Sequence, residues 1–433
     1  MKKLLCIFCA AAMAAMPVSC VYEIEDVFEQ SASQRISAKV SECADLLTSA
    51  EHGWLIQYYP GTDRAYGGST YAARFGADGN VEVAWEKART VYETQTSHYT
   101  VNMSSSVVLT FDTYNDYIHY WSDPDYFSGN DYGGDFEFAY VGGDSRQLEF
   151  RGIKTGNRIV FTALETDIVS AIESISDIRR QYYVSYDVNG ETLESDGEYN
   201  VLYCDVPSED NPEYYVEASY PFAYSTTGIV FYEPVEIGGV TMQNLVWNSD
   251  SEVFVASDAI DGSGASVTVE VKGSQSPDYI AYDDFPGTYE MAYDGGETMQ
   301  VEITSNGDYS TLNMLMEYGS NTYTFVLGWY PDGHLTMTTQ YVGMENDEYY
   351  IWFCPYSSDN YLAYAETYGF NLVNNGGQTD GGISLAFEDN GVWSRGTSSI
   401  SLYRFTSPTT ASSATRVSRL LLLEDMETLT KTN

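Results

Sequence analysis

Basic residues are scarce in this chain. Its 433 residues include 20 Lys and Arg against 63 Asp and Glu, which gives a formal net charge of −43 at pH 7. A field of this sign repels nucleic acid and anionic lipid head groups. The composition therefore argues against a nucleic-acid partner and favours neutral or cationic partners.

Cysteine and histidine are also few, at six and four residues. Beyond residue 20 the cysteines are Cys43, Cys204 and Cys354, which are far apart and form no Cys-x-x-Cys. This spacing argues against a disulfide scaffold, a thiol redox site or a structural zinc site. We expect the three to act as small buried hydrophobic residues, and whether Cys204 and Cys354 meet stays open.

Signatures of several enzyme classes are missing as well. The sequence has no His-Glu-x-x-His zinc motif and no Gly-x-Ser-x-Gly nucleophile elbow. No glycine-rich phosphate loop precedes a helix, and the strand–helix alternation of a Rossmann domain is absent. A catalytic pair of carboxylates needs a separation of about 5 to 9 Å, which folding creates and sequence does not show. A carboxylate-dependent hydrolase therefore stays an alternative.

An apolar run of thirteen residues, 4–16, follows a short basic start. As a helix it would be about 20 Å long, shorter than a bilayer core of about 30 Å, so it predicts a secretory signal over residues 1–19. We predict that Cys20, which follows a small residue, is lipidated and begins the mature chain. Pro17 stands where such signals usually carry an aliphatic residue, so an ordinary secretory signal is the alternative.

The residues directly after Cys20 are acidic, and we assign residues 20–30 to a tether. An acidic stretch at this place resembles the surface-export signal of Bacteroidota lipoproteins. The resemblance implies a lipid-anchored protein of the outer membrane, displayed on the cell surface. A solvated tether at the periplasmic face is the alternative.

Two segments have the periodicity of helices. One begins with a capping box at Ser31 and ends before Gly53. The other runs from Thr166, its expected cap, to about Arg180, with a single stripe of apolar residues. The remaining sequence consists of short strands joined by tight turns such as Asp78-Gly79. We therefore predict a mainly β fold with two helices, in which antiparallel meanders form barrels or sandwiches.

Turn-rich stretches divide the chain into regions. We predict an N-terminal domain that combines a helix, a β-meander and a closing helix, then a second β region, a linker and a C-terminal β domain (residues 31–181, 182–272, 273–284 and 285–405). The opening Gly287-Thr288-Tyr289 of the last domain resembles that of lipocalin-like barrels. Beyond Phe405 the strand pattern decays, and we expect the tail, 406–433, to hold one loose helix.

The densest cluster of polar and aromatic residues lies within residues 109–138. Its candidate ligand-binding residues are Asp112, Tyr114, Asn115, His119, Trp121, Asp123, Tyr132, Asp135 and Glu137. One interpretation is a sugar site, because aromatic faces beside carboxylates suit a sugar. A second is a Ca²⁺ site, because the loop is rich in side-chain oxygens and also includes Asp125 and Asp131, although the spacing departs from that of an EF-hand. A third interpretation is structural, with Asp112, Asn115 and Asp123 capping turns. His119 beside Asp112 or Asp123 as an acid or base is the fourth.

The same cluster carries a resemblance to a known family. With Gly53-Trp54, Tyr58-Tyr59-Pro60 and the lipid signal, its segment 109–115, His119 and its segments 122–124 and 132–138 resemble Bacteroidota lipoproteins catalogued as a domain of unknown function (number 4302). The match spans roughly residues 20–405. Members of that family sit beside outer-membrane nutrient-uptake partners, so the resemblance implies capture or processing of nutrients. It brings no catalytic residues with it.

These observations together predict a non-catalytic lipoprotein of the outer membrane. We expect an accessory subunit that captures a nutrient, a glycan or a peptide, beside an uptake channel and its capture lipoprotein. Calcium is the one cofactor that the sequence leaves open. A carboxylate-dependent, glycosidase-like hydrolase and a structural or adhesive surface protein are the alternatives.

Overall fold

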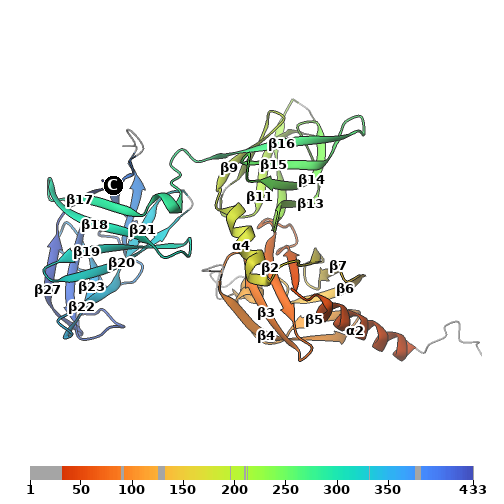
Figure 1. Ribbon diagram of the computed structural model, residues 1–433, viewed down its shortest axis with the longest axis horizontal. Helices are drawn as coiled ribbons and strands as arrows, with labels where there is room; N and C mark the ends of the chain where they lie inside the picture. Colours follow the sequence, from red (N-terminus) through yellow and green to blue (C-terminus); the bar gives the residue numbers. More distant parts are fainter. Residues whose placement is uncertain are drawn as a thin grey trace, which may run out of the picture.

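A computed structural model of the protein describes residues 32–88, 92–124, 132–195, 197–208, 211, 213–330, 332–375 and 382–432. In this part the strands form three closed antiparallel barrels of eight strands each and one four-stranded sheet (Figure 1). The mainly β prediction is confirmed. A short third helix, α3 (Asp116–His119), joins the two that were expected. The predicted signal, Cys20 and the tether lie outside the described residues.

None of the helices in the described ranges is long and apolar enough to cross a bilayer.

The first barrel closes where β1 pairs with both β2 and β8. Helix α2 (Ala32–Ser49) packs on this barrel through Cys43 and Leu47, and the Trp54 indole donates a hydrogen bond of 2.8 Å to the Leu47 carbonyl. Gly53 then turns the chain at a φ of +93°, where a Cβ would lie 2.6 Å from the Ala73 carbonyl oxygen. Only glycine therefore fits this turn. The strands are β1 (Trp54–Tyr58), β2 (Ser69–Phe75), β3 (Asn80–Trp85), β4 (Thr94–Met103), β5 (Val107–Phe111), β6 (Glu137–Gly143), β7 (Gln147–Gly152) and β8 (Arg158–Ala163).

Helix α4 (Ile168–Arg179) joins the first barrel to the second. Its cap is Asp167 and not Thr166, because the Asp167 carboxylate accepts hydrogen bonds from the amides of Val169 and Ser170. Strand residues alternate between the two faces of a sheet. The neighbours of the interior residues of the first barrel therefore point outward. Three of them pack with α4 in the core of the second barrel, namely Leu55, Ala72 and Ala84. The apolar stripe of α4 consists of Ile168, Ala171, Ile172, Ile175 and Ile178.

The second barrel contacts the first directly. The amide of Gly68 donates to the Phe222 carbonyl at 2.8 Å, and the Thr70 hydroxyl donates to the Tyr224 carbonyl at 3.0 Å. Its last strand runs to Gln275, so the linker starts after residue 275 and not at 273 as expected. The reason is that β16 must reach this far to pair with β9 and close the barrel. The strands are β9 (Tyr183–Val188), β10 (Glu191–Ser195), β11 (Val201–Pro207), β12 (Tyr215–Ser225), β13 (Gly228–Ile237), β14 (Val240–Asn248), β15 (Val253–Asp261) and β16 (Ser266–Gln275).

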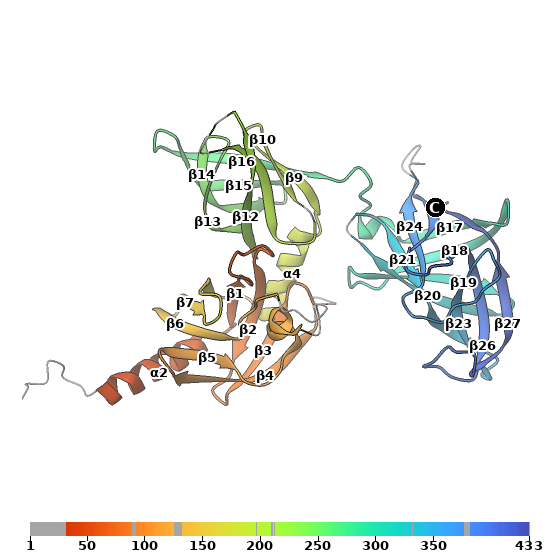
Figure 2. The same cartoon turned by 180° about the vertical axis from the view of Figure 1, so that it is seen from behind.

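The third barrel follows the linker and a short 3-10 helix, Tyr282–Asp284 (Figure 2). Its interior is filled by side chains that include Met291, Met314, Met316 and Met337, and the eight-stranded antiparallel architecture is consistent with the lipocalin-like expectation. Its strands are β17 (Gly287–Tyr293), β18 (Glu297–Ser305), β19 (Thr311–Tyr318), β20 (Asn321–Trp329), β21 (Leu335–Thr338), β24 (Gly369–Asn374), β25 (Ser384–Asp389) and β28 (Met426–Lys431). The adjoining four-stranded sheet holds β22 (Gln340–Glu345), β23 (Tyr349–Tyr356), β26 (Ser399–Phe405) and β27 (Arg416–Leu423).

The prediction for the tail after Phe405 is wrong. This segment contains no loose helix in its described residues but two strands, β27 and β28. Strand β28 pairs with β17 on one side and with β25 on the other. The tail is thus the strand that closes the third barrel.

The three cysteines are free. Cys43 and Cys354 are buried and Cys204 is partly buried. Burial raises the pKa of the Cys43 and Cys354 thiols to about 12, so both stay protonated at neutral pH. They serve as small apolar side chains, as the sequence predicts.

Candidate functional site

The cluster predicted from the sequence runs from the end of β5 to the start of β6 in the first barrel, and several of its members hold the loops together. The buried Asn115 caps α3, because its side-chain oxygen accepts from the amides of Tyr117 and Ile118 at 3.0 and 3.2 Å. The His119 ring stacks between Tyr114 and Phe136, with centroids 5.1 and 5.0 Å apart. Burial lowers the pKa of His119, so the ring is neutral at physiological pH.

The carboxylates of this cluster have separate partners. Asp112 pairs with His98 at 2.7 Å, and Asp123 accepts a hydrogen bond from the Tyr114 hydroxyl. The buried Asp135 accepts from the backbone of residues 154 and 155 and from the Thr155 hydroxyl at 2.6 Å. Glu137 is exposed at the start of β6. Asp112, Asp123 and Asp135 thus fix the turns around α3 and between β7 and β8.

No group of three His, Cys, Asp or Glu side chains in the described ranges is arranged to hold a metal ion. Asp125 and Asp131, which belong to the calcium hypothesis, lie outside those ranges.

Two other members of the cluster do come together. Trp121 and Tyr132 pack edge to face with centroids 5.0 Å apart, and both contact Tyr66. Tyr66 in turn packs against Tyr199 of the second barrel at 5.1 Å. The ammonium group of Lys87 lies 5.2 Å from the Trp121 ring and 5.9 Å from the Tyr199 ring. A continuous aromatic path therefore leads from the predicted cluster to the second barrel.

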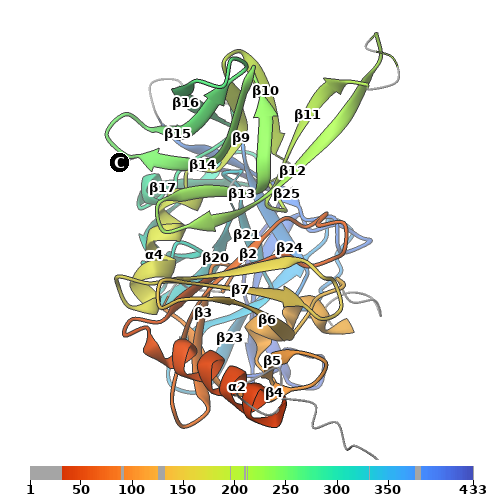
Figure 3. The same cartoon turned by 90° about the vertical axis from the view of Figure 1, so that its right-hand side faces the viewer.

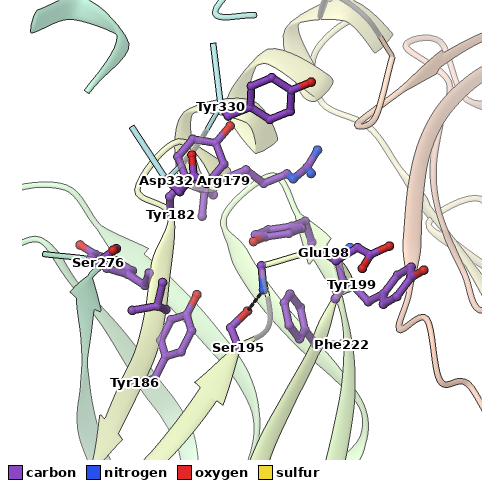
Figure 4. A pocket seen from close by; sticks show the side chains of 16 residues that line it. Arg179, Tyr182, Tyr186, Ser195, Glu198, Tyr199, Phe222, Ser276, Tyr330 and Asp332 are labelled. Atoms are coloured by element: carbon purple, nitrogen blue, oxygen red, sulfur yellow. Dashed lines mark hydrogen bonds between the residues drawn. The ribbon is translucent and has the colours of Figure 1, made fainter. Parts of the chain in front are cut away.

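This path ends at a cavity of about 380 Å³ where α4, the second barrel and a turn of the third barrel meet (Figure 4). Six tyrosines and Phe222 are among its sixteen lining residues. Polar groups from Ser195, Glu198, Ser276 and Asp332 interrupt the rings, and Arg179 is the one basic residue among the described lining residues. A concave, largely aromatic site with a few convergent polar groups is typical of small-molecule binding. The tyrosines are Tyr182, Tyr183, Tyr186, Tyr199, Tyr224 and Tyr330.

Helix α4 positions the cavity because its C-terminal end touches all three barrels. The Arg179 guanidinium donates to the backbone carbonyl of Glu86 in the first barrel and lies 5.7 Å from the Tyr224 ring of the second. The next residue, Arg180, places its guanidinium 3.5 Å from the Tyr309 ring of the third barrel. Tyr182 packs edge to face on Trp329, with centroids 5.1 Å apart. These contacts hold the turn with Tyr330 and Asp332 against the cavity.

A buried carboxylate lies behind the cavity wall. Glu86 is 6% exposed, and its Oε1 accepts a hydrogen bond of 3.1 Å from the side chain of Asn200, which also donates to the Gly68 carbonyl at 2.7 Å. The second carboxylate oxygen of Glu86 has no hydrogen-bond partner among the residues that the structure describes. Burial raises the pKa of Glu86, although the nearby Arg179 acts in the opposite direction. Burial likewise raises the pKa of Tyr224 to about 12, so Tyr224 offers a neutral hydroxyl.

The raised pKa of Glu86 predicts a pH dependence of stability. A carboxyl group whose pKa is higher in the folded than in the unfolded chain stabilises the fold below the unfolded pKa, here about 4.5. That contribution is lost as the pH rises through the folded pKa, at about 1.4 kcal/mol per unit of difference. The free energy of unfolding should therefore fall as the pH rises above about 4.5. We expect Glu86→Gln to remove the part of this fall that the Glu86 carboxyl causes. Urea denaturation from pH 4 to 8 measures it, and the exposed Glu137→Gln variant, the control, should retain the fall.

The sequence did not indicate this cavity. Its lining residues come from four separate segments, 178–200, 222–224, 276 and 330–332. The only trace in the sequence is the high tyrosine content, 39 residues, which strand formation alone also accounts for. Trp121 and Tyr132 were identified, but as members of a local site and not as the neighbours of Tyr66 and Tyr199.

Two family models match the chain. A family model described as Domain of unknown function (DUF4302) matches residues 24–249, which include the whole first barrel, α4 and the second barrel through β14. A second model, DUF4987, also described as a domain of unknown function, matches residues 261–402, which end before β27. No curated protein matches the chain. Since the first match covers more than half of the 433 residues, the chain belongs to the DUF4302 family of domains of unknown function.

Proposed function

We propose that this protein is a lipid-anchored accessory subunit of the outer membrane, displayed on the cell surface. It captures a glycan in the tyrosine-lined cavity, without transforming it, and passes it to an uptake channel. The observation that carries the proposal is the cavity itself, with its seven aromatic rings around a few polar groups. Its volume of about 380 Å³ lies within the range of small-molecule sites, roughly 300 to 1,000 Å³.

The chemistry of the wall favours a sugar over an apolar ligand. Tyrosine offers a flat apolar face for C–H groups and a hydroxyl at its edge. Glu198 and Asp332 accept hydrogen bonds from ligand hydroxyls. The Arg179 guanidinium donates, and Glu86 behind it balances its charge, so the cavity does not demand an anionic ligand.

An exposed tyrosine gives the cleanest test of the site. Tyr330 is 47% exposed and lines the cavity from the third barrel. We expect Tyr330→Ala to weaken binding of a glycan found in a calorimetric screen by about five- to tenfold, the loss of one ring contact of about 1 to 1.4 kcal/mol. The control is Tyr361→Ala, since Tyr361 is 51% exposed and does not line the cavity. Equal affinities of the two variants would remove the cavity as the binding site.

The lipid anchor has its own test. We expect palmitate to label the unsubstituted protein and not Cys20→Ala, and the variant to leave the membrane fraction, because a single uncharged side chain cannot replace acyl chains as an anchor. Unchanged membrane attachment of the Cys20→Ala form contradicts the proposed anchor.

A hydrolase is the second candidate, favoured by one observation. Glu198 and Asp332 place two carboxylates on the cavity wall, as a carboxylate-dependent hydrolase requires. Incubation of the bound glycan with the protein separates the two candidates. Product formation that disappears in Glu198→Gln supports the hydrolase, and recovery of the intact glycan supports capture.

A further inference from the structure

Strands β11 and β12 continue beyond the wall of the second barrel as a two-stranded ribbon (Figure 3). They pair from Val201 opposite Pro221 to Pro207 opposite Tyr215. On one side β10 pairs with β11 only at residues 202 and 203, and on the other side β13 pairs with β12 only from Phe222 onward. In the described part of the chain, residues 204–207 and 215–218 therefore have only each other as strand neighbours.

The two most exposed large hydrophobic side chains of the described residues lie on this ribbon or directly before its second strand. Tyr214 and Tyr215 are 68% and 64% exposed, and Val216 is 50% exposed. A two-stranded ribbon with no layer behind it is only marginally stable in water. Exposed tyrosines that gather at one projecting element are typical of a binding surface.

The two faces of the ribbon differ in chemistry. Side chains directly opposite in an antiparallel pair lie on the same face, and alternate pairs share it. Asp205 lies opposite Glu217, and the pairs on either side place Tyr203 and Tyr215 on the same face. The other face carries Val206 opposite Val216 and Cys204 opposite Ala218. One face is therefore acidic and aromatic, and the other is small and apolar.

The pairing of Asp205 with Glu217 is unfavourable as it stands. Like charges that lie directly opposite each other destabilise a strand pair. Residues 181–271 contain no Lys, Arg or His, and the one basic residue on the strands of the second barrel, Lys272 of β16, lies opposite Asp187 of β9 and not on the ribbon. A cation from outside would stabilise the ribbon on binding.

We propose that this ribbon docks onto a protein partner that presents an arginine to the acidic face. The guanidinium lies between Asp205 and Glu217 and against the ring of Tyr215, and the apolar face packs on the partner. Arginine suits this site better than lysine, because its planar fork bonds carboxylates and stacks on aromatic rings. At two other places in the described residues, an arginine contacts both a carboxylate and an aromatic ring. Arg395 pairs with Asp359 and lies 3.5 Å from the Tyr361 ring, and Arg180 pairs with Asp177 and lies 3.5 Å from the Tyr309 ring.

The test measures binding of a fluorescent peptide in which arginine alternates with threonine to the purified full chain. We expect saturable binding that falls at least tenfold in the double variant Asp205→Asn/Glu217→Gln and also falls in Tyr215→Ala. The control is Glu290→Gln/Glu302→Gln, which removes the same charge from exposed positions of the third barrel. A peptide with neutral citrulline in place of arginine should not bind.

The outcomes separate docking from general electrostatics. Equal binding of the arginine and citrulline peptides, or an equal loss in both double variants, overturns the proposal. Displacement of the peptide by millimolar calcium, with calcium binding lost in the same double variant, assigns the carboxylates to a metal and also overturns it. In cells, a photocrosslinker in place of Tyr215 should label a partner segment that contains arginine, and one in place of the exposed Tyr92 should not. A labelled segment without arginine counts against the proposal.

Discussion

Ending the chain at Phe405 should unfold the third barrel. The truncation removes β28, which is hydrogen-bonded to β17 and to β25, so the barrel loses a wall strand and opens. It also removes Leu423, Met426 and Leu429, which are 2%, 9% and 0% exposed in the core. Burial of three such side chains contributes about 5 to 9 kcal/mol, which is comparable with the stability of a whole domain, about 5 to 15 kcal/mol.

Limited proteolysis followed by mass spectrometry measures this effect. Residues 287–405 of the truncated chain should be degraded rapidly, whereas the first two barrels, which have their own cores, should stay resistant. A chain that ends at Thr432 keeps β28 and serves as the control. Equal resistance of the third barrel in both chains would show that β28 is dispensable. The same reasoning predicts that the segment matched by the second family model, which ends at residue 402, does not fold by itself.

The tail was missed for a local reason. In β28 the buried residues Met426 and Leu429 are three positions apart, whereas their partners on β17, Tyr293 and Met291, are two apart. A bulge with one extra residue accounts for the difference, and it replaces the alternation of a strand by a spacing that resembles a helix. A sequence pattern read with period two therefore fails at this strand.

Features that depend on neighbouring residues were predicted well. The Asp78-Gly79 turn joins β2 and β3, with Gly79 at a φ of +84°, and the isoleucine stripe of α4 is buried as its spacing indicates. Closure of the barrels was not predictable, because pairs such as Trp54 with Ala163 join residues more than a hundred positions apart. Nothing in the local sequence specifies which distant strand completes a sheet.

The candidate site shows the same limit. The cluster around α3 was found because its residues are close in sequence, and the structure uses Asn115 and Asp135 there to cap turns. The cavity combines Arg179, Tyr199 and Tyr330, which become neighbours only when three barrels meet around the end of α4. Sequence proximity indicates local hydrogen bonding, whereas a concave site depends on the arrangement of domains.

The arrangement of the first two barrels should depend on α4, and Ile172→Asp tests this dependence. Ile172 is 0% exposed and packs among Leu55, Ala72 and the core of the second barrel. Removal of a buried isoleucine side chain costs about 2 to 5 kcal/mol, and an unpaired carboxylate at the same place adds a further desolvation penalty. We therefore expect the free energy of unfolding of this two-barrel unit to fall by about 5 kcal/mol or more, with glycan binding lost because α4 no longer positions Arg179.

Urea denaturation monitored by tryptophan fluorescence measures the loss of stability. The conservative variant Ile172→Val should lower the free energy of unfolding by only about 1 kcal/mol. Ser174→Asp is the matched control, since it places the same carboxylate on the opposite side of the helix, where the half-buried Ser174 donates a hydrogen bond to the Ser170 carbonyl. If both aspartate variants unfold at the same urea concentration, the buried face of α4 does not join the barrels. If Ile172→Asp alone is destabilised, α4 is the element on which the cavity depends, because it is the one helix whose residues line it.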